Sequence, residues 1–410
     1  MAIIHPFKAL RPVRDKVHLV ATRPYYSYKK NVLKAKLQDN PYTFLRIINP
    51  EFHAKSKTQP NSPERFEQVK ESYEKFKAEG VLIEDQQPHL YIYRQTKNGH
   101  PFIGVIAGTS VEEYEKDTIK KHEATLTSRE EMFTTYLDIV GYNAEPVLMS
   151  YEGNEIIDQL LEKISSDRPE YEFTTTDKIT HELWIVPAPY EQKLLKAFQE
   201  IEALYIADGH HRSASSVRLS ENRKSRNETA YKNQDYILSF LIDEKRLEIL
   251  EFNRLIKNCP LSLEKLLNAL EQSFEISPLK SKCKPKKEHD IHLCFKGKWF
   301  CLTCKPTIIQ QDHPVESLDA EILTQYILDP ILHIQDLKTN SNIEFISGAE
   351  SLTVFEQKIT KQQFDLGFVL YPVRMDQVKK VADHQMIMPP KSTWVEPKMR
   401  SGLTIYNINE

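Results

Sequence analysis

The sequence predicts a mixed α/β or α+β fold. Segments with the two-residue alternation of strands interleave with segments of helical periodicity along the whole chain. Hydrophobic residues make up 40% and charged residues 28% of the composition, which is near the average for globular proteins. A chain of 410 residues is long enough for one large or two ordinary domains with a sizeable core.

The clearest helix is the stretch SPERFEQVKESYEKFKAEG at 62–80. Ser62 is suited to cap its first turn, Pro63 to begin it and Gly80 to end it. Its apolar residues recur at helical spacing and share one face, which predicts packing against a core. These residues are Phe66, Val69, Tyr73 and Phe76.

The remaining elements follow from the same patterns. Strands are expected at 89–95, 102–108, 181–186, 203–207, 235–243, 247–253 and 365–373, with a hairpin over 290–304. Helices are expected near 129–140, 153–164, 189–202, 212–221, 262–274, 318–328 and 374–383. The polar, basic stretch 277–290 is expected to join a region 1–276 to a C-terminal α/β region 290–410. It could equally be a loop within one domain.

Charge and cysteine content limit the class of protein. The chain has 55 basic and 58 acidic residues, which gives no general attraction to nucleic acid or to anionic membranes. It has no run of transmembrane length and no signal-peptide core at its start, so we expect a cytoplasmic protein. Five cysteines, an odd number, also favour a reducing compartment. Cys301 and Cys304 should point to opposite faces of one strand, which favours buried thiols over a zinc site.

The stretch LYIADGHHRSASS at 204–216 has the features of an anion site. If 203–207 is a buried strand and 212–221 begins a helix, Gly209 falls at the corner, where a residue without a Cβ permits a sharp turn. The first N–H groups of a helix lack intrahelical partners and carry the positive end of its dipole. A phosphate or carboxylate is therefore expected to bind at this corner.

The side chains of the loop suit that ligand. Arg212 can contact an anion with two N–H groups, and Asp208 is placed to hold a metal ion or to orient a histidine. His210 and His211 can donate hydrogen bonds or carry a proton near neutral pH. Further hydroxyl donors are available on Ser213, Ser215 and Ser216. The competing interpretation is that Asp208 caps the helix and the histidines bind backbone carbonyls.

Other site chemistries find little support. The sequence contains no phosphate-binding P-loop, no Rossmann glycine motif and no Gly-x-Ser-x-Gly elbow. Adjacent histidines cannot share one face of a helix, which disfavours a two-histidine metal helix.

On these residues the loop resembles the Asp-Gly-His-x-Arg loop of the ParB and sulfiredoxin-like superfamily, whose glycine corner binds phosphates. Over nearly its whole length the chain resembles the domain-of-unknown-function family 1015 (DUF1015). The matching stretches are HPFKALRPVRDKV, NPYTFLRIINPE, KKHEATLTSRE, HELWIV, LDAEIL and MPPKSTWVEPKMRSGL. The resemblance implies a ParB/sulfiredoxin-like core with large insertions and a C-terminal α/β portion.

The resemblance also implies an activity. Sulfiredoxins carry a catalytic cysteine where this chain has His210, so their reductase chemistry is disfavoured. With its acid before the glycine, the loop is similar to that of the free-serine kinases. This implies a phosphotransferase acting on free serine or O-phosphoserine, in the kinase or the phosphatase direction. Mg²⁺ is the implied metal, and ATP, ADP or pyrophosphate the phosphate donor or acceptor, so the partner is a small molecule rather than nucleic acid.

Two further segments complete the expected site. Glu123 is expected to accept the proton of the serine hydroxyl. The phosphate-binding residues expected outside the loop are Lys121, His122, Arg129, Lys391 and Lys398. The alternatives are a charged loop that leads into a helix near 120–129 and a surface loop pinned by Trp394.

The chain departs from the family pattern at two places. Tyr26 stands where members commonly have an acid, and Asn253 stands before Arg254 where related chains tend to have histidine. Arg254 could still reach a phosphate. Loss of the acid leaves two other functions open: a nucleotide-binding switch of the ParB kind, or an inactive scaffold.

Overall fold

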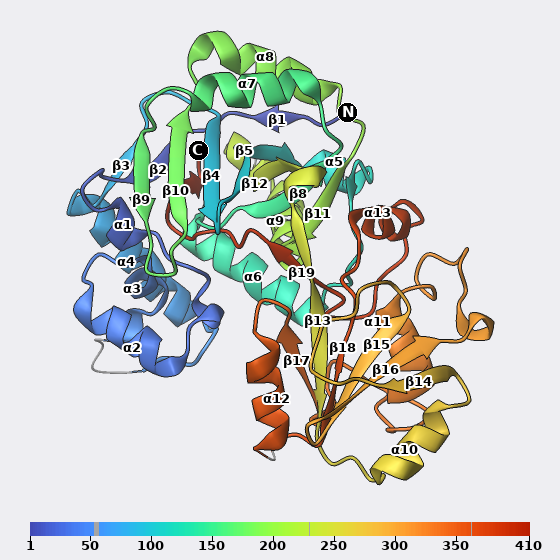
Figure 1. Ribbon diagram of the computed structural model, residues 1–410. Coiled ribbons are helices and arrows are strands. Elements are labelled where there is room, and N and C mark those ends of the chain that lie inside the picture. The colour runs from blue at the N-terminus through green and yellow to red at the C-terminus, as the bar shows by residue number, and fades with distance from the viewer. Residues whose placement is uncertain (53–56, 229, 362) are drawn as a thin grey trace. The chain divides into compact units, whose positions relative to one another are not determined.

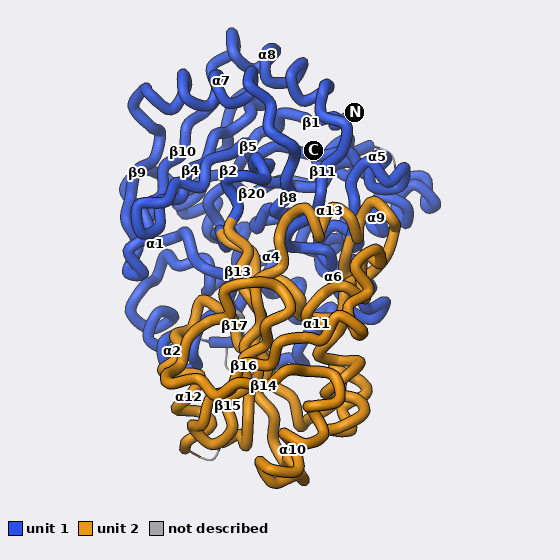
Figure 2. The backbone as a smooth tube through the Cα atoms, turned by 45° about the vertical axis from the view of Figure 1, so that its right-hand side comes forward, with its two compact units in different colours: residues 1–121, 125–247, 397–410 blue, residues 122–124, 248–396 orange. Residues whose placement is uncertain are grey.

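The computed structural model describes residues 1–52, 57–228, 230–361 and 363–410 and confirms the mixed α/β class. The chain forms two compact units, which are described separately (Figures 1 and 2). Unit 1 comprises residues 1–121, 125–247 and 397–410, and unit 2 comprises 122–124 and 248–396. The stretch 277–290, where the sequence suggested a joint, lies inside unit 2.

Unit 1 is built on a mixed nine-stranded sheet. In spatial order its strands are β6 (Ile119–Lys120), β11 (Leu204–Asp208), β8 (Val147–Tyr151), β12 (Tyr236–Asp243), β5 (His100–Ser110), β4 (Tyr91–Lys97), β10 (Thr180–Ile185) and β9 (Tyr171–Thr174), with β1 (Ile4–His5) paired to β5. A four-stranded sheet runs β3 (Leu82–Glu84), β2 (Ala9–Pro12), β20 (Ile405–Asn407) and β7 (Tyr142–Asn143). Through β20, the last residues of the chain are paired directly to β2 near its start.

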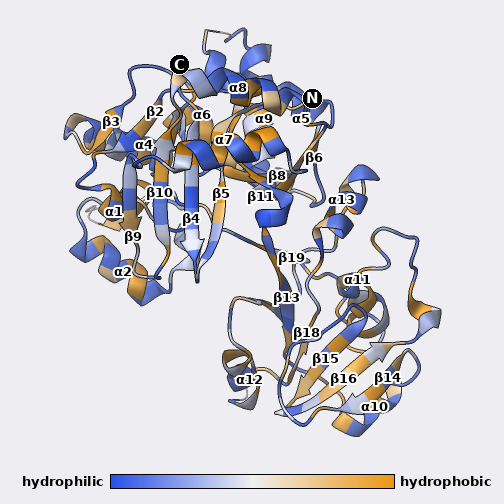
Figure 3. Ribbon diagram, turned by 45° about the horizontal axis from the view of Figure 1, so that its top comes forward, coloured by the Kyte–Doolittle hydropathy of each residue, from blue (hydrophilic) through white to orange (hydrophobic). Residues whose placement is uncertain are grey.

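The helices of unit 1 pack on these sheets. They are α1 (Val17–Val20), α2 (Lys30–Asp39), α3 (Phe44–Ile48), α4 (Pro63–Ala78), α5 (Val111–Glu115), α6 (Thr127–Val140), α7 (Glu155–Ser165), α8 (Ala188–Gln199) and α9 (His210–Ser225), with 3₁₀ turns at Tyr25–Ser27, Pro50–Phe52, Lys232–Asp235 and Glu244–Arg246. Helices α7 and α8 bury apolar faces in the main core, and Figure 3 shows hydrophobic and hydrophilic residues side by side on α7. Full burial of each such side chain contributes about 1.5–3 kcal/mol.

The helix expected at 62–80 is confirmed as α4. The Ser62 hydroxyl accepts a hydrogen bond from the Arg65 N–H, and Pro63 occupies the first turn. The four apolar residues of its face are all buried in the core that α4 shares with α3, α6 and the four-stranded sheet. The capping residue, the proline and the apolar spacing read from the sequence therefore all agree with the structure of this helix.

Unit 2 contains a seven-stranded sheet. Its order is β14 (Phe274–Pro278), β16 (Lys298–Cys304), β15 (Asp290–Phe295), β18 (Leu366–Val369), β13 (Glu248–Ile256) and β17 (Ile343–Ser347), with β19 (Thr393–Glu396) paired to β13. Its helices are α10 (Leu263–Leu270), α11 (Asp319–Leu323), α12 (Leu352–Thr360) and α13 (Met375–Asp383), with a 3₁₀ turn at Pro306–Ile308 and a π-helical turn at Thr324–Leu328.

Two expectations about unit 2 have clear outcomes. The hairpin over 290–304 is confirmed as β15 and β16, and Cys304 enters the core beside Leu302 and Phe274 while Cys301 lies across from His292 on the other face. The helix expected at 262–274 ends at Leu270, because Phe274 begins a strand that pairs with Cys304. Of the helices in the described ranges, none has the length and apolar character needed to cross a bilayer.

Candidate functional site

The Asp208–Gly209 corner lies where the sequence predicted it, between β11 and α9. Strand β11 is buried as far as Ala207, and its register against β8 shifts between Ile206 and Asp208. Gly209 has φ 109°, a conformation that side chains other than glycine rarely adopt. A Cβ at this position would lie 3.1–3.2 Å from the guanidinium of Arg212. Glycine therefore suits the turn, and a side chain here would also press on the guanidinium of Arg212.

Helix α9 begins at His210, two residues earlier than expected, and has Gly209 as its N-cap without a side-chain cap. The first intrahelical bond runs from the Ser213 N–H to the Gly209 carbonyl, at 3.0 Å. The positive end of a helix of 16 residues therefore lies directly at the corner. The alternative in which Asp208 caps the helix does not describe this geometry.

Arg212 joins the corner to the segment before β8. Its Nη1 donates to the carbonyl oxygens of Glu145, at 3.1 Å, and Pro146, at 2.6 Å. It also forms ion pairs with the carboxylates of Glu145, at 3.0 Å, and Asp208, at 3.4 Å. The guanidinium thus fixes the shape of the loop and brings two carboxylates to its rim.

The C-terminal segment of unit 1 brings Lys398 to the same corner. The Nζ of Lys398 lies 3.5 Å from Oδ1 of Asp208, and both side chains are partly exposed. The Lys398 carbonyl accepts a hydrogen bond from the buried amide of Gln95 at 3.3 Å. Asp208, Gly209, Arg212 and Lys398 therefore form one cluster, as the sequence predicted for these four residues.

Buried polar contacts hold this C-terminal segment in place. Arg400, which is 4% exposed, donates to both carboxylate oxygens of Asp177 and to the hydroxyl of Thr175. Burial disfavours the charged form of Asp177, but the bonds from Thr175 and Arg400 outweigh it and lower the pKa of the carboxyl. The Ser401 hydroxyl donates to Glu145 Oε2 at 2.8 Å. The backbone that carries Lys398 is therefore held at Lys398 itself and at the residues that follow it.

A buried histidine extends this network. His181 is fully buried, with Tyr93 Oη 2.8 Å from its Nδ1 and Thr175 Oγ1 3.2 Å from its Nε2. Its ring stacks on Phe173 with a centroid distance of 5.0 Å. Burial, together with the nearby charge of Arg400, lowers the pKa of His181 to about 3, so the ring is neutral at physiological pH.

The serines of α9 bond back to their own helix. Their hydroxyls donate to carbonyls one turn earlier: Ser213 to Gly209, Ser215 to His211 and Ser216 to Arg212. The three residues are buried, as is His210, while His211 is half-buried. These hydroxyl protons are directed into the helix, because a serine in a helix can bond to the carbonyl of residue i−4.

The other expected residues lie on both units. In unit 1, Lys121 follows β6, which is parallel to β11, and its Nζ lies 4.3 Å from the ring centroid of Tyr114. Arg129 is exposed in the first turn of α6.

In unit 2, burial lowers the pKa of His122 to about 4, and its carbonyl accepts a hydrogen bond from the Met388 N–H. Glu123 is exposed. Lys391 has φ 60°, and its Nζ lies 5.6 Å from the ring centroid of Phe252.

The structure also describes Asn253 and Arg254, where the chain departs from the family pattern. The Asn253 side chain accepts a hydrogen bond from the Leu370 N–H at 3.1 Å, so it bonds within the sheet of unit 2. Arg254 is fully buried; its Nη1 donates to the Phe252 carbonyl, and burial lowers its pKa to about 9. The side chain of Tyr26 lies outside the described part of the chain.

Sequence reasoning missed Glu145, Arg400 and Ser401 as members of the cluster. Ser401 and Arg400 belong to the stretch MPPKSTWVEPKMRSGL, but nothing in their spacing indicates Glu145 or Asp177 as partners. Within the described ranges, no group of three or more His, Cys, Asp or Glu side chains has the arrangement of a metal site. A single carboxylate such as Asp208 still fits Mg²⁺, which usually takes its other ligands from phosphates and water.

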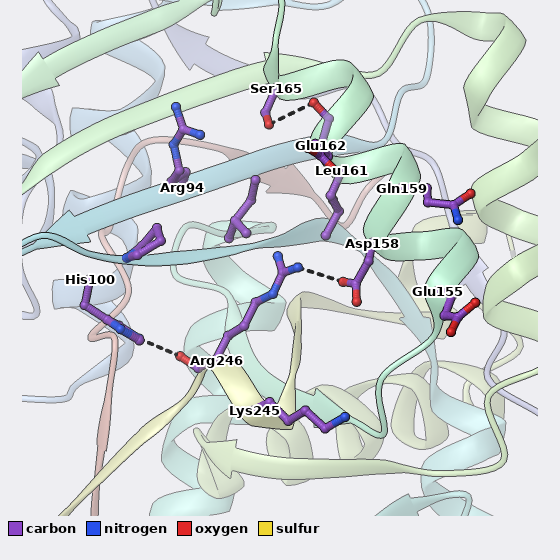
Figure 4. Close-up of a pocket in the computed structure, with 12 residues that line it drawn as sticks. Arg94, His100, Glu155, Asp158, Gln159, Leu161, Glu162, Ser165, Lys245 and Arg246 are labelled. Atoms are coloured by element: carbon purple, nitrogen blue, oxygen red, sulfur yellow. Dashed lines mark hydrogen bonds and ion pairs between the residues drawn. The ribbon is translucent and has the colours of Figure 1, made fainter.

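A separate cavity of about 600 Å³ lies in unit 1, between α7, the ends of β4 and β5, and the turn at Glu244–Arg246. Figure 4 shows Arg246 directed toward Asp158, with which it pairs at 2.8 Å, and His100 beside the Arg246 carbonyl. Its lining combines apolar side chains with charged ones, among them the Arg246–Asp158 pair, and none of the expected site residues belongs to it.

Comparison with known proteins gives a family match. The family described as "Protein of unknown function (DUF1015)" matches residues 4–321, so the match ends before the stretch 388–403. No curated protein matches the chain.

The chain is also similar to three solved structures, each with a TM-score below 0.5. A free serine kinase in complex with AMP has 13% identity and TM-score 0.39, and the match covers 74% of this chain and 91% of that one. SbnI with C-terminal truncation from Staphylococcus aureus has 10% identity and TM-score 0.39, with coverage of 73% of this chain and 87% of that one. A conserved hypothetical protein from Pyrococcus furiosus has 14% identity and TM-score 0.35, with coverage of 73% of this chain and 95% of that one.

Proposed function

We propose that this chain, which belongs to the DUF1015 family of proteins of unknown function, transfers a phosphoryl group to or from the hydroxyl of free serine. The reaction would interconvert serine and O-phosphoserine, in the kinase or the phosphatase direction, with ATP, ADP or pyrophosphate as donor or acceptor. The residues of the Asp208–Gly209 corner would hold the phosphate. We expect this activity in the cytoplasm and without a nucleic-acid partner.

The observation that carries the proposal is the meeting of Lys398 with Asp208 at the positive end of α9. Phosphoryl transfer depends mainly on positioning and on neutralising the charge of the phosphate oxygens. Lys398, Arg212 and the helix end supply positive charge at one place. The resemblance of the loop to that of the free-serine kinases supports serine as the acceptor.

The step itself has a simple balance. The serine oxygen forms a bond to phosphorus as the bond from phosphorus to the donor oxygen breaks, and a carboxylate accepts the serine proton. Lys398, Arg212 and Gly209 would hold the phosphate, and His210 or His211 would donate to the leaving oxygen. Further contacts are proposed for Lys121 and Arg129, which also belong to unit 1.

Mg²⁺ is the proposed metal, with Asp208 as its protein ligand. Asp208 would hold the ion, and the chemistry that Mg²⁺ would supply is neutralisation of charge on the phosphate oxygens.

Phosphorus NMR on the purified chain with Mg²⁺ tests the proposal. Separate samples would hold O-phosphoserine alone, O-phosphoserine with ADP, and serine with ATP, ADP or pyrophosphate. The expected result is a new phosphoserine or free-phosphate signal that Arg212→Ala and Asp208→Ala abolish. Arg246→Ala is the matched control, because it also removes a partly buried, ion-paired arginine of unit 1.

The other outcomes decide between the remaining functions. Tight nucleotide binding with unchanged spectra would favour the nucleotide-binding switch, and stabilisation by no nucleotide or phosphate would favour the inactive scaffold. Full activity of both loop variants would move the site elsewhere. Thermal unfolding of each variant shows whether the fold survives the substitution.

A further inference from the structure

We propose that Glu145 is a further catalytic residue, which orients the acceptor hydroxyl and takes its proton. This role rests on the proposed function, because it assigns the base of the same reaction. The sequence predicted Glu123 in that role, and Tyr26 stands at the position where family members commonly have an acid. Transfer to a hydroxyl releases its proton, so the reaction needs a proton acceptor beside the phosphate corner, and Glu145 is a carboxylate that the structure places there.

The backbone around Glu145 is held from several directions. It lies between β7 and β8, and its N–H donates to the Asn143 side chain at 3.2 Å. The carbonyl of the preceding residue, Ala144, accepts a hydrogen bond from the Gly402 N–H at 2.9 Å. The carbonyl of Glu145 itself accepts from Arg212. A base held in this way loses little entropy when it meets a substrate.

The two carboxylate oxygens of Glu145 have different neighbours. Oε1 lies 3.0 Å from Arg212 Nη1, at the rim of the phosphate corner. Oε2 accepts a hydrogen bond from the Ser401 hydroxyl at 2.8 Å. One oxygen thus faces the cation beside the proposed phosphate, and the other already holds a serine hydroxyl. An acceptor serine would need a contact of the same kind, in which its hydroxyl donates a hydrogen bond to the carboxylate.

The two carboxylates of the corner therefore differ in what they can do. Both carboxylate oxygens of Asp208 face cations, Oδ2 that of Arg212 and Oδ1 that of Lys398. Glu145 pairs with one cation and one hydroxyl, and its side chain is 20% exposed. A carboxylate oxygen can accept more than one hydrogen bond, so Glu145 can bind an incoming hydroxyl beside Ser401.

The step assigned to Glu145 balances without another reactant. The acceptor oxygen forms its bond to phosphorus while its proton moves to the Glu145 carboxylate, and the donor oxygen leaves with the electron pair of its bond to phosphorus. Arg212, paired with both Glu145 and Asp208, couples the base to the corner that would hold the phosphate.

The test compares pH profiles of turnover, measured by phosphorus NMR with serine and the active donor, for four variants of the full chain. In Glu145→Gln we expect kcat to fall by about 100-fold or more with KM little changed, and the acid limb of the profile to disappear. Ser401→Ala removes the contact but keeps the carboxylate, so the acid limb should remain. Glu123→Gln should keep it too. Asp158→Asn, in the separate cavity, is the control for removal of a paired carboxylate.

Each other result overturns the inference. If Glu145→Gln and Ser401→Ala lower kcat alike and both keep the acid limb, Glu145 only supports the structure of the site and takes no proton. If Glu123→Gln alone loses the limb, the base is Glu123. A phosphoryl group found on Ser401 by mass spectrometry would make that serine the acceptor. If the unaltered chain shows no turnover, the proposed function itself is wrong. If it turns over and any of these three results is found, only the role of Glu145 is wrong.

Discussion

The ammonium group of Lys398 lies 3.5 Å from the carboxylate of Asp208, although the two residues are far apart in the sequence. Asp208 ends a strand and precedes Gly209, the N-cap of α9. Lys398 belongs to the C-terminal segment of unit 1, which is held by contacts of Gln95, Arg400 and Ser401. This pair joins two of the three stretches in which the sequence predicted phosphate ligands.

Replacing Lys398 should weaken binding more than folding. In Lys398→Met we expect KM for the phosphorylated ligand to rise by about 10–100-fold, as for a lost charge-assisted contact of about 1.5–3 kcal/mol. The free energy of unfolding should change by less than about 1 kcal/mol, because the ion pair is partly exposed. Lys193→Met on α8 is the control; a similar rise in KM there would argue against a specific role for Lys398.

Gly209→Ala should destabilise the chain and loosen Arg212. Positive φ alone costs alanine about 1–2 kcal/mol, and the added Cβ would also lie against the guanidinium. Gly99→Ala is a matched control, since Gly99 has φ 82° and a Cβ added there would have no other atom within 4 Å among the described residues. Urea unfolding should show a larger loss for Gly209→Ala; equal losses would mean that the approach of Arg212 adds nothing.

Asp177 should contribute stability that acid removes. Its pKa is lowered in the folded chain from the ordinary 3.8, so its contribution is complete above that value and is lost as pH falls through the lower folded pKa. We expect Asp177→Asn to cost about 1–3 kcal/mol at neutral pH, because it weakens the bonds to Arg400. The difference from the unaltered chain should shrink below about pH 4; a difference independent of pH would contradict this account.

His181 should make the fold sensitive to mild acid. Its folded pKa is lowered from 6.5 to about 3, so the unfolded chain binds a proton that the folded chain does not. Stability is complete above pH 6.5 and falls as pH decreases, by up to about 1.4 kcal/mol per pH unit from this residue. His181→Gln should reduce the slope of unfolding free energy against pH between about 6.5 and 4. An unchanged slope would mean that His181 is protonated in the folded chain.

Local signals in the sequence were sufficient for the elements around the site. Ser62, Pro63 and the apolar spacing identified α4, and the apolar run before Asp208 identified β11. The start of α9 was placed two residues late, because His210 and His211 carry no strong helix signal. The end of α10 was placed late because the pairing of Phe274 with Cys304 is a long-range contact.

The sequence by itself determined the corner: a buried strand, a glycine at a sharp turn and a helix that follows it. These features depend on neighbouring residues, whose spacing and conformational preferences can be read along the chain. Only the tertiary structure decided which groups surround Arg212, why the serines of α9 turn inward, and how Lys398, Arg400 and Ser401 reach the loop. Such contacts depend on strand pairing and burial between distant segments, which no local pattern encodes.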